Sequence, residues 1–119
     1  MPHDDAVVDE VANELVTWPG VHVERRADGA AVVLYEQLRL GVLYLDRAIA
    51  VLPFEGAERD ELIEHGDAEP AEALPDAEGV SHELRGPADV TAVLELFDRR
   101  YRELRGEAPP YSSQDPGYA

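Results

Sequence analysis

The sequence predicts an α+β domain, a two-layer sandwich with two or three helices on one face of a mostly antiparallel, five-stranded sheet. Two segments, residues 4–17 and 87–104, repeat apolar residues every three or four positions, the spacing of helices that bury one side. Between them, four apolar segments follow one another across short links, which indicates an antiparallel meander. The expected order is α-β-β-β-β-α-β-α. The length of 119 residues suits one domain, which we place at residues 1–105, and the proline- and glycine-rich residues 106–119 predict a disordered acidic tail.

The first helix ends at "WPG", because Pro19 disfavours helical geometry in the residue before it. Its buried side is expected to comprise Val8, Val11, Ala12, Leu15 and Val16. Two strands flank the turn "ADG", and the second of them, residues 31–36, is almost entirely apolar. "LRLGVLYLD" predicts a third strand with four apolar residues on one face, Leu38, Leu40, Val42 and Tyr44. "AIAVLPF" predicts the fourth strand, which Pro53 closes.

The second half of the chain predicts a short charged helix, a loop, a fifth strand and a long helix. "EGAERDELIEHG" is the charged helix, with His65 in its last turn and Gly66 at its C-cap. Its narrow apolar side places it on the surface. "DAEPAEALPDAEG" is the loop, "VSHELR" is the strand, and Pro87 takes the first position of the long helix. The buried side of that helix is expected to comprise Val90, Val93, Leu94, Phe97, Tyr101 and Leu104.

The charge of the chain indicates its habitat. The formal net charge is −16, from 26 acidic residues and ten basic ones, all of which are arginine. This excess of one sign repels itself in dilute buffer, whereas in molar salt the Debye length falls to about 3 Å. We therefore expect a cytoplasmic protein of a halophile. We do not expect a nucleic-acid partner, because binding to a phosphate backbone depends on cationic contacts.

Several classes of protein are excluded by what the sequence lacks. The chain has no cysteine, which rules out disulfides and thiolate chemistry. The segment "MPHDDAVVDE" has no apolar run and does not resemble a signal peptide. The longest apolar stretches are about half a membrane span, so we expect no membrane insertion.

One stretch, "LPDAEGVSHELRGP", brings an aspartate, a serine and a histidine close together in sequence. On a strand, Ser81 and His82 point to opposite faces, so they cannot form a nucleophile–base pair. His82 shares the apolar face and is expected to be a partly buried core histidine. Asp76 belongs to a turn for which Gly79 supplies a positive φ.

The remaining histidines and carboxylates are not expected to form a site. His3 with Asp5, and His22 with Glu24, make two-member metal pairs without an evident third ligand. His65 suits the negative end of a helix dipole. The paired acids of the short helix, Glu58 with Glu61 and Asp60 with Glu64, belong to a solvated acidic surface.

Two other groups of residues invite a binding hypothesis. "RRYRELR" is the basic cluster of the chain, and Arg99, Arg102 and Arg105 would form the anion site if the protein has one. We expect these arginines to pair with Glu95 and Glu103. Four aromatic residues are expected to line the sheet–helix interface or a pocket, namely Trp18, Tyr35, Tyr44 and Tyr101.

Seven short segments follow one another over residues 7–104: "WPGV", "LG", "LPF", "RDELIEHGDAEP", "LPD…VS", "RGPADV" and "RRY". Their order resembles that in a family of small luciferase-like proteins of unknown function. The family pattern has four histidines and a tryptophan at positions that here hold Val42, Tyr44, Ala71, Glu72 and Gly79. A metal or catalytic role built on those histidines therefore does not transfer to this chain. More distantly, the layout resembles the MmcQ/YjbR-like fold, for which DNA binding has been suggested.

We expect a non-enzymatic binding or interaction module with no catalytic, cofactor-binding or metal-binding residue. Its partner would be an unidentified protein or small ligand, and a homodimer is compatible with the sequence. Two alternatives stay open. One is a small enzyme or ligand-binding domain of the luciferase-like family, with Tyr44 and His82 near its pocket. The other is a nucleic-acid-binding regulator, which requires the arginine cluster to lie on a surface free of carboxylates.

Overall fold

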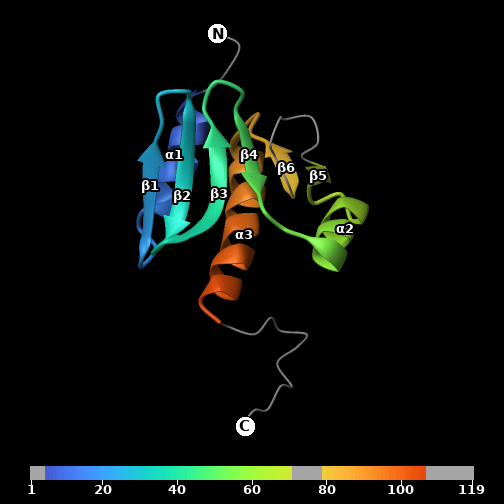
Figure 1. Ribbon diagram of the computed structural model, residues 1–119. Helices are drawn as coiled ribbons and strands as arrows, with labels where there is room; N and C mark the ends of the chain where they lie inside the picture. The colour runs from blue at the N-terminus through green and yellow to red at the C-terminus, as the bar shows by residue number, and fades with distance from the viewer. Residues whose placement is uncertain (1–4, 71–78, 107–119) are drawn as a thin grey trace.

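The computed structural model describes residues 5–70 and 79–106, which form three helices and one antiparallel sheet of six strands (Figure 1). In chain order the elements are α1 (Asp5–Leu15), β1 (Val21–Arg25), β2 (Ala30–Tyr35), β3 (Leu38–Tyr44), β4 (Ile49–Leu52), α2 (Gly56–Glu64), β5 (Glu69–Pro70), β6 (Val80–Glu83) and α3 (Pro87–Leu104). The predicted α+β class and the predicted order of the major elements are confirmed. Asp76 and residues 107–119 of the expected tail lie outside the described residues.

The strands lie in the spatial order β1-β2-β3-β4-β6-β5, and every neighbouring pair is antiparallel. The first four form the predicted meander, and β6 returns to pair with β4. The sixth strand is the two-residue β5, which pairs with β6 in a segment predicted as loop. Two residues give no periodicity to recognise, and a proline is tolerated in β5 because this strand lies at the edge of the sheet.

A β-bulge in β3 overturns the predicted alternation of Leu38, Leu40, Val42 and Tyr44. The pairing register shifts between Val33 and Leu34 of β2, which leaves Leu40 as an extra residue. A bulge of this kind moves the following side chains to the other face. Leu40 therefore belongs to the core under the helices, whereas Val42 and Tyr44 belong to separate clusters away from it.

The main core lies between the sheet and the pair α1 and α3. Gly41 lets α3 approach closely, because a Cβ there would lie 2.8 Å from the Phe97 ring and 2.8 Å from the Val51 carbonyl oxygen. Of the predicted side of α3, four residues are buried and two, Leu94 and Leu104, are partly buried, and Leu96 is buried in addition. Val16 was predicted to be buried but is 49% exposed, because α1 ends one residue earlier.

Helix α2 lies at the β5–β6 end of the sheet and buries a single residue, Leu62, as expected for a surface helix. It ends at Glu64. His65, predicted in the last turn, is the C-cap residue, and Gly66 follows with a positive φ of 78°.

Candidate functional site

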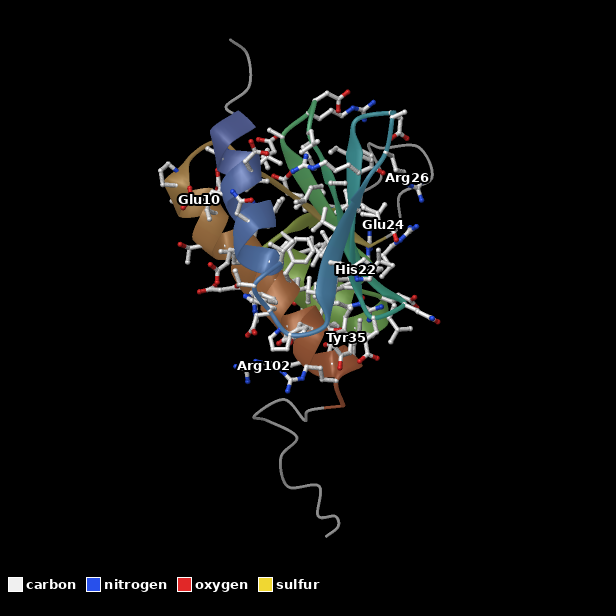
Figure 2. The ribbon with its side chains drawn as sticks, turned by 90° about the vertical axis from the view of Figure 1, so that its left-hand side faces the viewer. Glu10, His22, Glu24, Arg26, Tyr35 and Arg102 are labelled. Atoms are coloured by element: carbon white, nitrogen blue, oxygen red, sulfur yellow. The ribbon has the colours of Figure 1, made fainter. Side chains whose placement is uncertain are left out.

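The most distinctive surface of the molecule is the face of the sheet opposite the helices, which we call the open face. Both α1 and α3 lie on the other side of the sheet (Figure 2). β2, β3 and β4 contribute seven apolar residues to the open face: Ala30, Val32, Leu34, Val42, Tyr44, Ile49 and Val51. An antiparallel sheet with one solvated face is expected to carry polar residues there. A contiguous apolar patch at such a place is typical of an interaction surface.

The register of the strands arranges the open face in two rows. The first row, which we call the Tyr44 row, runs across five adjacent positions: Arg26, Ala30, Tyr44, Ile49 and Glu83. The second row, which we call the Val42 row, lies beside it: Glu24, Val32, Val42, Val51 and Ser81. Each row is apolar in the middle and polar at both ends.

The small side chains of the open face are covered by the large ones. Val32, Val42 and Val51 are only 5–9% exposed, although no described helix lies over them. Tyr44 and Ile49 pack beside them and keep part of their surface in solvent. The patch is therefore a packed layer that presents larger side chains outward.

The edge of the open face carries charges of both signs. Figure 2 shows His22, Glu24 and Arg26 projecting from β1 and the following turn, away from the helices. His22 Nε2 lies 3.8 Å from Glu24 Oε2, and both side chains are exposed. Among the described residues, Arg26 and Arg39 have no ion-pair partner, whereas Arg25, on the other side of β1, lies 3.7 Å from Asp9 of α1.

Ser81 and His82 point to opposite faces of β6, as predicted. The Ser81 hydroxyl donates a 3.4 Å hydrogen bond to the Pro70 carbonyl oxygen. His82 Nδ1 lies 2.8 Å from the Glu83 carbonyl oxygen, so Nδ1 donates this hydrogen bond. His82 is 15% exposed, which confirms a partly buried histidine.

A small cleft of about 230 Å³ lies between α2, β6 and α3. Its lining comprises Leu62, Gly66, Asp67, His82, Ala92, Glu95, Leu96 and Arg99. Arg99 is already engaged, since its Nε donates a 2.7 Å hydrogen bond to Glu58. Tyr44 lies on the open face, so the expectation that Tyr44 and His82 share a pocket is wrong: the two residues are on opposite sides of the sheet.

Asp89 orders the start of α3 beside His82. Burial opposes the charge of Asp89, but hydrogen bonds from the Arg85 backbone and side chain, with the Arg85 charge, outweigh burial and lower the Asp89 pKa. Asp89 Oδ1 lies 3.9 Å from His82 Nδ1. These contacts hold the β6–α3 turn and leave no group aligned to pass a proton to Ser81.

A carboxylate pair that the sequence did not indicate joins α2 to α3. Burial, then a hydrogen bond and the negative charge from Glu58, together raise the pKa of Glu103 to about 7, against the opposing charges of Arg100 and Arg99. Glu58 was expected to pair with Glu61, and both contact Arg99. The two glutamates that meet are 45 positions apart, so no spacing rule could have paired them.

The arginine cluster is surrounded by carboxylates. Arg99 pairs with Glu58 and Glu61, Arg102 pairs with Asp98 at 2.9 Å, and the Arg105 guanidinium carbon lies 5.0 Å from the centroid of the Tyr101 ring. The condition set for a nucleic-acid-binding regulator, arginines on a surface free of carboxylates, is not met.

His22 and Glu24 gain no third ligand from the described part of the chain. Within residues 5–70 and 79–106, no three His, Asp or Glu side chains are grouped so that they could bind one metal ion. His3, half of one predicted pair, lies outside these ranges. Asp60 and Glu64 are exposed on α2.

Three of the four singled-out aromatic residues form one cluster at the sheet–helix interface. The Tyr101 ring centroid lies 5.1 Å from that of Trp18 and 5.4 Å from that of Tyr35. The Tyr101 hydroxyl donates a 2.7 Å hydrogen bond to the Pro19 carbonyl oxygen. The cluster packs α3 against β2 and against the turn between α1 and β1. The fourth residue, Tyr44, lies on the open face instead.

Comparison with known proteins adds no family assignment. No model of a known protein family matches the chain, and no curated protein is significantly similar to it. None of the described helices is both long enough and apolar enough to span a membrane.

Proposed function

We propose that this protein is a non-enzymatic interaction module of a halophile's cytoplasm, which binds a protein partner through the open face. The observation that carries the proposal is the apolar patch on β2, β3 and β4, on the side of the sheet that α1 and α3 leave uncovered. Partner proteins commonly bind at apolar patches surrounded by polar residues.

The chemistry of the titratable groups supports binding over catalysis. Ser81 and His82 are separated by the sheet, and His82 donates from Nδ1 to a backbone carbonyl. Arg99, the cation of the α2–α3 cleft, is bonded to Glu58. These side chains hold the fold together, and each has a structural partner.

The acidic exterior supports the habitat part of the proposal. No charged residue is fully buried among the described residues, so even the partly buried carboxylates reach solvent. Such a surface benefits from molar salt, which screens the net charge of −16.

The proposal is tested by photocrosslinking in cells whose cytoplasm holds molar KCl. A benzophenone amino acid replaces Tyr44 on the open face, and in a matched control it replaces Thr91, which is exposed on α3. Both changes leave the cores intact, so a difference between them reports on the surface alone.

We expect discrete protein adducts from position 44 and none of the same mass from position 91. Adducts of equal intensity from both positions, or no adduct from position 44, would contradict the proposed function.

A further inference from the structure

The ends of the two rows of the open face are complementary to each other. The Tyr44 row begins with the cation Arg26 on one edge and ends with the anion Glu83 on the other. Tyr44 lies midway, two strand positions from each. The Val42 row begins with Glu24 and ends with Ser81, with Val42 midway. A surface with this order matches a reversed copy of itself.

We propose that the open face binds a second copy of this chain, so that the protein is a two-fold symmetric dimer with two sheets packed face to face; the inference rests on the proposed function and names its partner. The two-fold axis runs parallel to β3, in the plane between the two sheets. This operation places the Arg26 guanidinium opposite Glu83 of the second copy, twice per dimer. It places Tyr44 on Tyr44 and Val42 on Val42 at the axis.

The remaining positions of both rows also match. Ala30 lies opposite Ile49 of the second copy, a small residue against a large one, which lets the layers interdigitate. In the Val42 row, Val32 lies opposite Val51, and Glu24 lies opposite a serine hydroxyl that can donate to it.

Charge favours this partner at this face. Two copies of a chain with net charge −16 repel each other over most of their surface. The open face differs, because Arg26 and Arg39 lack an ion-pair partner among the described residues. Glu24 and Glu83 stand at its edges, where Glu24 lies 3.8 Å from His22 and Glu83 lies 3.6 Å from Arg85, and both carboxylates stay exposed to a second partner. Self-association therefore has the least repulsion where the apolar patch is.

The size of the face suits a modest dimer. Five strands about 4.8 Å apart, with about 18 Å of strand length, cover about 400 Å² in projection per copy. Two copies together would bury on the order of 1,000 Å² of accessible surface, which is the lower range of specific interfaces. We expect dissociation constants in the micromolar range, not those of an obligate dimer.

One contact opposes the arrangement and makes it depend on salt. Arg39, near the start of β3, lies opposite Leu34 of β2 in the strand register. Because the two-fold axis runs along β3, the Arg39 side chains of the two copies approach each other. Molar salt screens this repulsion, the general repulsion between the acidic chains and also the Arg26–Glu83 attractions, and it does not weaken apolar contact. The dimer is therefore expected to tighten as KCl rises.

The test measures the mass of the full chain by sedimentation equilibrium, from 1 μM to 500 μM in 1 M KCl. We expect the mass to rise from 13.1 kDa towards twice that value. Arg26→Glu and Glu83→Arg should each raise the dissociation constant about threefold in 1 M KCl, because each turns two cross-dimer attractions into repulsions that salt partly screens. The double variant should restore the dissociation constant to close to the original value.

Arg25→Glu is the matched control. It makes the same charge change at the neighbouring residue, but on the helix side of β1, where Arg25 faces Asp9. It should leave the dissociation constant nearly unchanged. Ile49→Thr, which removes partly exposed apolar surface and keeps a β-branched side chain suited to a strand, should weaken the dimer roughly tenfold. Circular dichroism verifies that each variant is folded.

The outcomes separate this inference from the proposed function. A monomer at 500 μM overturns the inference, and so does a dimer that Arg26→Glu weakens no more than Arg25→Glu. If the purified chain is monomeric while benzophenone at position 44 still captures another protein in cells, the interaction module stands and its partner is not a second copy. If both measurements are negative, both proposals fail.

Discussion

The carboxyl groups of Glu58 on α2 and Glu103 on α3 share a hydrogen bond, although the two residues are 45 positions apart in the chain. Two carboxyl groups can share a hydrogen bond only if one holds a proton. Burial raises the pKa of Glu103 to about 7, with Glu58 as the second cause, so Glu103 is the protonated partner at mildly acidic pH.

Because of this pair, the free energy of unfolding is expected to fall as the pH rises from about 4.5 to about 7. An unfolded Glu103 loses its proton near pH 4.5 and the folded one near pH 7, so between these values the folded state binds more protons and its advantage declines. Glu103→Gln should remove this decline and raise the free energy of unfolding at pH 8 by about 1 kcal/mol, a value reduced for partial solvent screening. Thermal unfolding from pH 5 to pH 8.5 in molar KCl measures the effect. The exposed Glu61→Gln serves as control, and parallel profiles for Glu103→Gln and the original would refute the assignment.

Tyr101→Phe should lower the free energy of unfolding, because it weakens the contact between α3 and the α1–β1 turn. The change removes the 2.7 Å hydrogen bond to the Pro19 carbonyl oxygen while the ring contacts remain. We expect a loss of about 1 kcal/mol, seen as a fall of about 4 °C in Tm. Tyr44→Phe is the control, because the Tyr44 hydroxyl bonds to no described residue; equal effects would show that the Pro19 contact contributes nothing.

Gly41→Ala should be among the most damaging small substitutions. The added Cβ would lie 2.8 Å from both a Phe97 ring carbon and the Val51 carbonyl oxygen, and neither can move without disturbing the core. We expect a loss of about 2–3 kcal/mol in thermal unfolding. Gly86→Ala has open space around its Cβ and an extended backbone, so its effect should stay within about 0.5 kcal/mol. Similar losses in both variants would contradict this account of the helix–sheet contact.

Folding should require salt. The net charge of −16 destabilises the compact state until the ionic strength is high enough to screen it. Circular dichroism over a KCl series should show the unfolding midpoint rising into the molar range. A parallel series in sucrose, which adds no ions, should not reproduce the rise, and full stability in dilute buffer would count against a halophilic origin.

Local sequence patterns predicted the fold class because each major element has its own signal. The apolar side of α3, the position of Pro87 and the stops at Pro19 and Pro53 all lie within a few residues of the features that they determine. The bulge at Leu40 could not be read this way, because it depends on how β3 pairs with β2. β5 is too short to have a pattern.

The open face was only partly visible in the sequence. The continuous apolar run of β2 is the signal that could have found it, since a strand with one solvated face should alternate. Its extension to Val42 and Tyr44 was hidden by the bulge, which reverses the faces of β3. The Glu58–Glu103 pair required the tertiary packing of α2 against α3.

The measurement that tests the central claim most directly is the methyl NMR spectrum of the valines on dilution from 1 mM to 10 μM in molar KCl. Val32, Val42 and Val51 lie on the open face, directly under the side chains that would meet the second copy, whereas Val33 and Val93 lie in the core under the helices. We predict concentration-dependent shifts for the first three methyl pairs and constant shifts for the last two. Constant signals for all five, or changes confined to residues on the helix side, would contradict self-association through the open face.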